Sequence, residues 1–172
     1  MAGEAPKNLV FVYGTLKKNH ANHFLLEDLI SSNDAVHIGQ RTTRLQYPLV
    51  TGLYGIPYLI NKPGSGQKIR GELYSVSKRG LARLDELEGI KVNHYERLQI
   101  EVSEEEEPNG AVLAEAYFAH CRFGERLWEK RGKYGMCEFG ENDGVLYVMV
   151  KDRPTFSSFF DEVEAFLSSS NS

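Results

Sequence analysis

The sequence predicts an α+β protein in which a curved or barrel-like sheet is flanked by helices. Three observations support this fold class. Strand-like runs outnumber helical ones, turn-forming residues punctuate the chain, and an amphipathic segment closes it. The sequence contains no internal repeat and no linker long enough to divide it, so we expect residues 1–172 to form one domain.

The first half of the chain predicts two strands, a helix and a turn. Residues 9–13 form an apolar, β-branched and aromatic run that ends at a glycine, which is typical of a buried strand. Residues 22–30 precede a Ser-Ser-Asn break and predict a helix, with Leu25, Leu26, Leu29 and Ile30 at helical spacing. Residues 36–45 alternate loosely, as in a half-exposed strand. In the Gly- and Pro-rich stretch 47–66, residues 62–64 (Lys-Pro-Gly) fit a type II turn.

The second half continues the sheet. Residues 69–76 predict a strand, and Ser77 is placed to cap a helix at 78–88. Residues 95–102 and 112–120 both predict strands, the first with clear two-residue alternation. The four consecutive glutamates between them are typical of a solvated hairpin tip.

The end of the chain is less regular. Residues 123–144 are charged and favour no single element. Beyond them, six apolar residues share one helical stripe and predict a closing amphipathic helix that packs on the body: Phe156, Phe159, Phe160, Val163, Phe166 and Leu167. We therefore expect a core at 9–120 and a tail at 121–172 that ends in this helix.

Composition excludes several classes of protein. With 20 Lys and Arg against 24 Asp and Glu, the net charge is −4, which argues against a nucleic-acid-binding protein. No apolar run is long enough to span a membrane, and the N-terminal residues lack the apolar core of a secretory signal. Two cysteines suit a reducing compartment. We expect a cytoplasmic protein with no nucleic-acid or membrane partner.

The motifs that would indicate a metal or a catalytic cysteine are incomplete. His20 and His23 are one helical turn apart, but no third ligand accompanies them. Residues 139–150 resemble a calcium loop in spacing but have apolar residues at its first and last positions. His120 and Cys121 are neighbours on a predicted strand, so their side chains should point to opposite faces. The sequence therefore predicts no metal and no cofactor.

Residues 13–16 (Tyr-Gly-Thr-Leu) form the first of two features that suggest chemistry. A strand that stops at a glycine presents backbone N–H groups with no side chain in the way. Consecutive amides turned outward form a donor site for a carboxylate or an oxyanion. An ordinary strand-to-loop turn is the alternative reading of this pattern alone.

The second feature is Glu88 at the end of the predicted helix. With about 100° per residue, Glu88 falls between Leu81 and Leu84 on the apolar face, whereas Glu86 points to solvent. Burial and the negative end of the helix dipole both raise the pKa of Glu88 towards the range useful for proton transfer. A structural ion pair, for example with Arg97, or a frayed helix end are the alternatives.

Six ordered motifs in residues 11–88 resemble one family. They are Phe-Val-Tyr-Gly-Thr-Leu-Lys (11–17), Tyr-Pro-Leu-Val (47–50), Ile-Pro-Tyr-Leu (56–59), Pro-Gly-Ser-Gly (63–66), Gly-Glu-Leu-Tyr (71–74) and Leu-Asp-Glu-Leu-Glu (84–88). Together they resemble the γ-glutamylcyclotransferase-like superfamily, most closely its γ-glutamylamine cyclotransferase branch and the plant avirulence-induced group. Beyond about residue 120 the likeness to the γ-glutamylamine enzymes decreases, although Asp-Arg-Pro (152–154) and the closing helix are similar to the plant members.

The resemblance implies a small mixed β-barrel with a pocket at its mouth. It implies that Tyr13, Gly14, Thr15 and Leu16 hold the glutamyl part of a substrate and that Glu88 is the catalytic acid and base. The expected reaction converts a small γ-glutamyl amine or amino acid into 5-oxoproline and a free amine, without metal or nucleotide. Two alternatives remain open, a ligand-binding protein without turnover and an interaction module that uses 121–172. The sequence leaves the leaving group and the oligomeric state undetermined.

Overall fold

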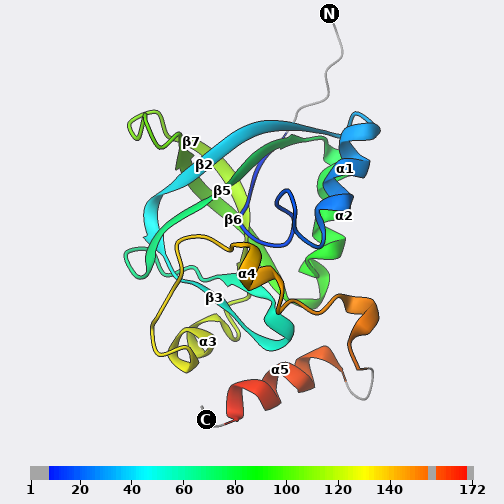
Figure 1. Cartoon of the computed structure of the whole chain (residues 1–172), viewed down its shortest axis with the longest axis vertical. Coiled ribbons are helices and arrows are strands. Elements are labelled where there is room, and N and C mark those ends of the chain that lie inside the picture. Colours follow the sequence, from blue (N-terminus) through cyan, green and yellow to red (C-terminus); the bar gives the residue numbers. More distant parts are fainter. Residues whose placement is uncertain (1–7, 155–157, 170–172) are drawn as a thin grey trace, which may run out of the picture.

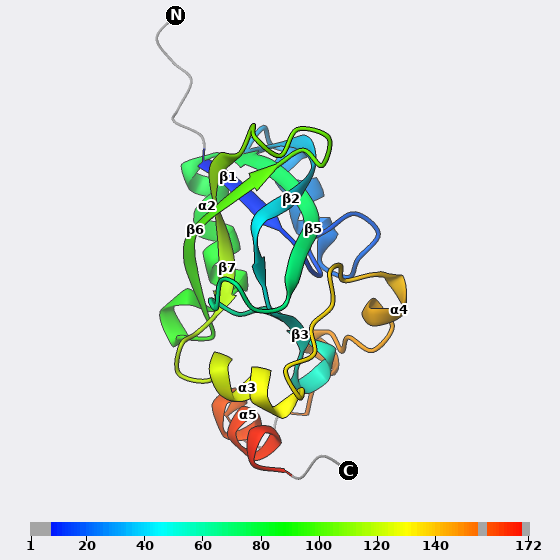
Figure 2. The ribbon, with the colours of Figure 1, turned by 90° about the vertical axis from the view of Figure 1, so that its left-hand side faces the viewer.

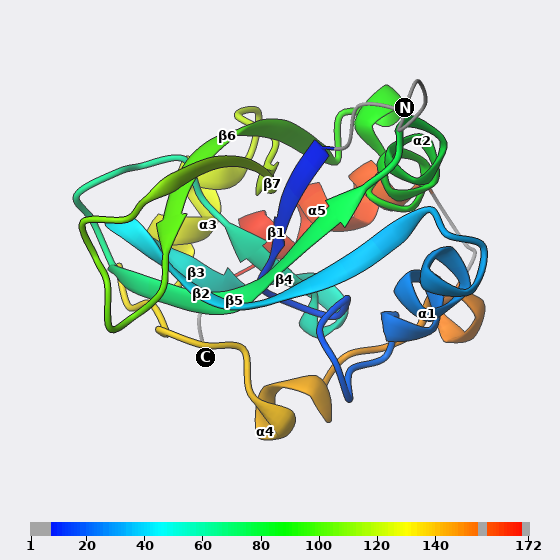
Figure 3. The same ribbon diagram turned by 90° about the horizontal axis from the view of Figure 1, so that it is seen from above.

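Five strands close into a mixed barrel. The structure, a computed structural model, describes residues 8–154 and 158–169. The ring contains β1 (Asn8–Val12), β5 (Gln67–Val76), β2 (Ala35–Tyr47), β6 (Tyr95–Ser103) and β7 (Val112–Ala119), in that order (Figure 1). Neighbours are antiparallel except β7 and β1, which pair in parallel through Val10 and Glu115 and complete the ring. Seen from above, β1 lies between β7 and β5 (Figure 3). The predicted barrel with flanking helices is confirmed.

A short hairpin extends the sheet beyond the barrel. It contains β3 (Leu49–Thr51), the 3-10 turn η1 (Leu53–Gly55) and β4 (Pro57–Leu59), which pairs in parallel with β7. These strands were not predicted, because three residues are too few to show a periodicity. The predicted type II turn is present: Ser65 N–H donates to the Lys62 carbonyl at 3.2 Å, and Gly64 has a φ of +94°.

Helices cover one side and one end of the barrel. α1 (His23–Ser31) and α2 (Lys78–Leu87) lie together on one side, whereas α3 (Gly124–Lys130) and α5 (Phe159–Ser168) stack across the lower end (Figures 1 and 2). Smaller turns are η2 (Ile90–Val92), α4 (Glu141–Gly144) and η3 (Val150–Asp152). No helix in the described part of the chain is long and apolar enough to cross a membrane.

Strand β1 is apolar from Leu9 onward, and both faces of its last three residues are buried. Val10 and Val12 pack in the core under the helices, while Phe11 and the following Tyr13 pack inside the barrel. The alternation of a strand thus divides one continuous apolar run between two cores.

The closing helix packs on the body, as predicted. Ser158 caps α5, its Oγ accepting the Asp161 N–H at 3.2 Å, and Val163 is buried in the main core. The remaining described members of the stripe pack against that core: Phe159, Phe160, Phe166 and Leu167. Phe156, which the prediction included, lies outside the described residues. The stripe is therefore used within the molecule, which weakens the interaction-module alternative.

Several local predictions were wrong or incomplete. Ile30 is 39% exposed, because only the Leu25, Leu26 and Leu29 side of α1 faces the core. α1 begins at His23, so His20 lies outside the helix, where it packs against Phe139. The unassigned stretch 123–144 contains α3 and α4.

Candidate active site

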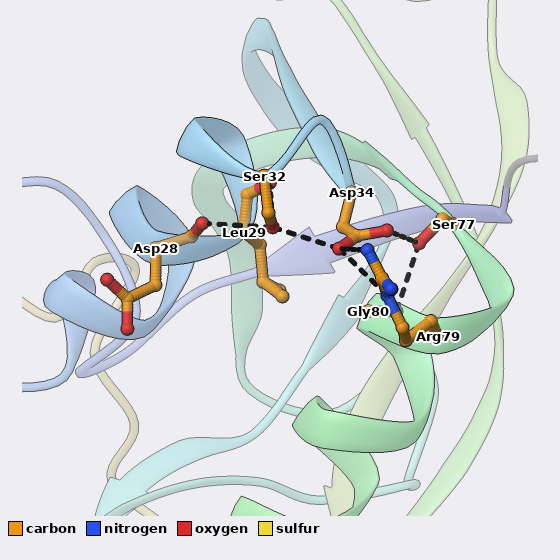
Figure 4. Close-up of polar contacts among 7 residues, drawn as sticks. All are labelled: Asp28, Leu29, Ser32, Asp34, Ser77, Arg79 and Gly80. Carbon is orange, nitrogen blue, oxygen red and sulfur yellow. Dashed lines mark hydrogen bonds and ion pairs between the residues drawn. The ribbon is translucent and has the colours of Figure 1, made fainter.

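Polar contacts fix the start of α2 to the adjoining strand. Ser77 caps the helix by accepting the Gly80 N–H at 3.0 Å, as predicted, and donates to Asp34 at 2.8 Å (Figure 4). Arg79 Nη2 and Ser32 Oγ also donate to Asp34, at 2.8 and 2.9 Å. These donors, Arg79 first, lower the pKa of Asp34 to about 2. The cluster sets the position of the helix that carries Glu88.

Glu88 ends α2 on the face that the sequence predicted. Its N–H donates to the Leu84 carbonyl at 2.9 Å, and the chain then turns at Gly89, whose φ is +67°. Leu81 and Leu84 are buried and Glu86 is exposed. The helical geometry therefore extends to Glu88 and excludes the frayed-end alternative.

The predicted site residues come together around one pocket of about 260 Å³. The loop 13–16, which follows β1, forms one wall, and Glu88 and Gly89 at the end of α2 form another. Other walls come from Ile56 and Pro57 and from three tyrosines, Tyr95, Tyr117 and Tyr147. The two features that suggested chemistry from sequence thus face one cavity.

The loop beside this cavity has backbone donors without partners in the described part of the chain. The amide N–H groups of Gly14, Thr15 and Leu16 form no hydrogen bond to any other described residue. A Cβ at Gly14 would lie 2.6 Å from Pro57 Cγ, so only glycine fits against that wall without displacement. Free amides beside a pocket are suited to a carboxylate or a developing oxyanion.

Tyr13 has a structural hydroxyl. Its ring is buried inside the barrel, and its hydroxyl donates to the Tyr117 carbonyl at 2.6 Å and accepts the Leu59 N–H at 3.2 Å. The two hydrogen bonds join the residue that follows β1 to β7 and to β4. Tyr13 therefore positions the loop, and its hydroxyl proton is not available to a ligand.

The carboxylate of Glu88 has no counter-ion among the described residues. Arg97, the candidate partner from sequence, instead donates to Asp85 at 2.7 Å and to Glu115 at 3.2 Å. The ion-pair alternative is therefore wrong. Burial, together with the negative charge of Asp85, raises the pKa of Glu88 to about 8. A carboxyl group in this range can exchange a proton near neutral pH.

His94 also lines the pocket and was not anticipated. Its Nε2 lies 2.7 Å from the Tyr58 hydroxyl, and its ring packs against Tyr95 and Phe159. Burial, with a smaller effect of Arg153, lowers the pKa of His94 to about 3, so the imidazole is neutral at ordinary pH. A single histidine after a helix carries no pattern that the sequence analysis could have used.

A polar chain connects the loop 13–16 to the C-terminal segment. Asn22 Nδ2 donates to Thr15 Oγ1 at 2.9 Å and to the Tyr147 hydroxyl at 3.0 Å. Arg153 Nη2 donates to the same hydroxyl at 3.2 Å. Tyr147 and Arg153 both line the pocket. The only sequence signal for this wall was the Asp-Arg-Pro motif, which carried no assigned role.

The prediction for His120 and Cys121 was wrong. β7 ends at Ala119, so strand alternation does not apply, and the thiol lies 3.9 Å from His120 Nδ1. With Glu96 they place three potential ligand atoms within 4.8 Å of one another, but none of the three lines the pocket. His120 Nδ1 already accepts the Arg122 N–H at 3.1 Å.

Fold and pocket together define a class: a small mixed-barrel protein in which a carboxyl group of raised pKa and backbone amides without partners among the described residues line one pocket. The chain belongs to the family described as "Gamma-glutamyl cyclotransferase, AIG2-like", whose model matches residues 10–135. A protein of Arabidopsis thaliana named "Putative gamma-glutamylcyclotransferase" is 46% identical, over 96% of this chain and 94% of its own. Gamma-glutamylaminecyclotransferase B of Danio rerio is 38% identical, over 84% of this chain and 75% of its own.

The solved structures agree with the fold. The crystal structure of an AIG2-like protein from Mus musculus superimposes with a TM-score of 0.59 at 34% identity. The match covers 66% of this chain and 77% of the mouse chain. The family model ends before the C-terminal wall of the pocket, which Tyr147 and Arg153 form.

Proposed function

We propose that the protein is a γ-glutamylcyclotransferase. It would convert the L-γ-glutamyl group of a γ-glutamyl amine or amino acid into 5-oxoproline and release the free amine. One observation carries this proposal: an unpaired carboxyl group with a pKa of about 8 shares a pocket with three free backbone amides. The family membership and the names of the relatives support the same reaction.

Glu88 is proposed as the acid and base. The α-ammonium of the substrate is not nucleophilic until it loses a proton, and ionised Glu88 accepts that proton. The free amine then attacks the γ-carbonyl carbon, forming a C–N bond and a tetrahedral oxyanion. Attack leaves two protons on the ring nitrogen, and one of them passes to solvent. The C–N bond to the leaving amine then breaks as protonated Glu88 returns its proton to the departing nitrogen. Atoms and charge balance without a cofactor in these steps.

The loop 13–16 is proposed to bind the glutamyl part through its backbone. The amides of Gly14, Thr15 and Leu16 either stabilise the oxyanion or anchor the α-carboxylate. The pocket also brings the two ends of the glutamyl chain together, and such orientation is a large part of the barrier to ring closure. His94 is neutral and hydrogen-bonded to Tyr58, so it is not a competing base at neutral pH.

The test is release of 5-oxoproline from γ-glutamyl-alanine, γ-glutamyl-ε-lysine and glutathione by the full chain. Glu88→Gln is compared with Glu86→Gln, a matched change two residues earlier on the exposed side of the helix. We expect release from at least one substrate, lost in Glu88→Gln and kept in Glu86→Gln. A folded protein that binds these compounds without release would instead be a ligand-binding protein. The cytoplasmic location stays a prediction.

A further inference from the structure

One wall of the pocket is formed by residues beyond the family match. Tyr147 and Arg153 line the pocket, whereas the family model ends at residue 135. The segment that carries them is held to the hairpin of β3 and β4, since the Val148 N–H donates to the Tyr54 carbonyl at 2.9 Å. The hairpin therefore fixes where this segment lies.

Asn22 does not use its side chain as its place in the chain would suggest. It stands at the N-cap of α1, where an asparagine side chain usually accepts an N–H of the first helical turn, but it makes no such bond. Its Nδ2 instead donates to Thr15 Oγ1 at 2.9 Å and to the Tyr147 hydroxyl at 3.0 Å. Asn22 is 7% exposed and lines the pocket. A buried polar residue that gives up its local role beside a pocket points to a role in the site.

Asn22 holds Thr15 at two points. Besides the side-chain bond, the Asn22 N–H donates to the Thr15 carbonyl at 2.9 Å. Because the peptide unit is planar and trans, the Thr15 carbonyl and the Leu16 N–H point in opposite directions. Fixing the carbonyl therefore fixes the direction of the Leu16 N–H, one of the three amides of the loop that have no partner among the described residues.

Arg153 holds the Tyr147 hydroxyl from the other side. Its Nη2 donates to that hydroxyl at 3.2 Å, and its Nε donates to the Val148 carbonyl at 2.9 Å. Its guanidinium carbon lies 5.5 Å from the centre of the Tyr147 ring and 5.3 Å from that of Tyr54. Hydrogen bonds thus run without a break from the backbone of the C-terminal segment, through Tyr147 and Asn22, to the loop 13–16.

We propose that Tyr147 is a positioning residue for the loop 13–16 and acts through Asn22. This inference rests on the proposed function, in which that loop binds the glutamyl part of the substrate. The hydroxyl accepts one Nδ2 hydrogen of Asn22 while the other stays on Thr15 Oγ1. Without this acceptor the side-chain amide can turn back to cap α1, and Thr15 loses a fixed partner. Because every γ-glutamyl substrate shares the glutamyl part, the effect should not depend on the leaving amine.

The test is a double-mutant cycle on the full chain. Release of 5-oxoproline from γ-glutamyl-alanine and from γ-glutamyl-ε-lysine is measured for the unchanged chain, Tyr147→Phe, Asn22→Ala and the double variant. Tyr54→Phe is the matched control, because the Tyr54 hydroxyl also makes a side-chain hydrogen bond, to Glu162 at 2.7 Å, but does not line the pocket. The unfolding midpoint of each variant is measured alongside.

We expect Tyr147→Phe to lower kcat/KM about tenfold and by the same factor for both substrates, less than the roughly 10²–10³ that follows loss of an oxyanion donor itself. In the Asn22→Ala background the same change should alter kcat/KM by less than about twofold, because the connection is already broken. Tyr54→Phe should keep kcat/KM while its unfolding midpoint falls about as far as that of Tyr147→Phe.

Three results would overturn the inference and leave the proposed function standing. Effects of Tyr147→Phe and Asn22→Ala that multiply in the double variant would show that Tyr147 does not act through Asn22. Different factors for the two substrates would show a contact with the leaving amine instead. An equal loss of activity in Tyr54→Phe would show a purely structural role. No release from either substrate by the folded, unchanged chain would overturn both the inference and the proposed function.

Discussion

Replacing Glu88 by glutamine should remove activity and yet stabilise the fold at alkaline pH. The pKa of Glu88 rises from 4.5 to about 8 on folding, and a tenfold change in proton affinity is worth about 1.4 kcal/mol, so ionising it costs at most about 5 kcal/mol. Because Glu88 is only half-buried, we expect Glu88→Gln to gain about 2–4 kcal/mol above pH 8.

The pH dependence gives this prediction its sign. Below pH 4.5 the carboxyl is protonated in both states and the variant has no advantage. Between pH 4.5 and 8 the unfolded chain releases its proton first, so the stability of the unchanged protein falls relative to Glu88→Gln as the pH rises. Above about pH 8 the difference in stability between Glu88→Gln and the unchanged protein is constant.

The assay is chemical denaturation at pH 4.5, 7 and 8.5, alongside 5-oxoproline release. Loss of a general base lowers the rate by about 10²–10⁴, so Glu88→Gln should lose activity while its unfolding midpoint at pH 8.5 rises. Glu86→Gln is the control and should change neither quantity. A Glu88→Gln protein that is less stable than the unchanged protein at pH 8.5 would refute the reasoning, because it would show that the carboxylate stabilises the fold.

Three further predictions concern the surroundings of Glu88. Asp85→Asn removes a negative charge that raises the pKa of Glu88, so the acidic limb of the kcat/KM profile should move to lower pH. If the acidic limb of a folded Asp85→Asn variant did not move, Asp85 would not be raising the pKa of Glu88. Gly14→Ala should lower kcat/KM more than tenfold and destabilise the fold by about 1–3 kcal/mol, because the added Cβ meets Pro57 Cγ at 2.6 Å; unchanged kinetics would show that the loop tolerates a side chain. Asp34, with a pKa of about 2, should stabilise the fold above pH 3.8, an effect lost as the pH falls towards 2. Denaturation curves of Asp34→Asn should therefore approach those of the unchanged protein at low pH.

The sequence predicted the elements with strong periodicity and missed the short ones. The strands of the barrel were recognisable because each carries several β-branched or aromatic residues between turn signals. β3 and β4 have three residues each, and their pairing with distant strands leaves no local pattern. Closure of the barrel depends on a contact between Val10 and Glu115, about which the local sequence says nothing.

The two halves of the candidate site were predictable for different reasons. Glu88 is a charged residue on an apolar helical face, a local conflict that points to function. The loop 13–16 ends a buried strand at a glycine, which is also a local signal. His94, Tyr147 and Arg153 reach the pocket only through tertiary packing. His94 and Tyr147 are single polar residues without periodic spacing, and Arg153 was marked only by the Asp-Arg-Pro motif, which carried no assigned role.

The pKa of Glu88 depends on which carboxylates Arg97 contacts. If Arg97 paired with Glu88, a positive neighbour would lower the pKa of that carboxyl and leave a weak base. Arg97 instead contacts Asp85 and Glu115, and the Tyr117 hydroxyl donates to Asp85 at 2.8 Å. The same arrangement therefore removes the counter-ion from Glu88 and holds a carboxylate near it, within the same helix. If Glu88 is the base, as proposed, the ammonium of a substrate bound beside it should lower the pKa of Glu88 and ionise that carboxyl group. The acidic limb of kcat should consequently lie at lower pH than that of kcat/KM, and coincident limbs would show that the ammonium does not bind beside Glu88.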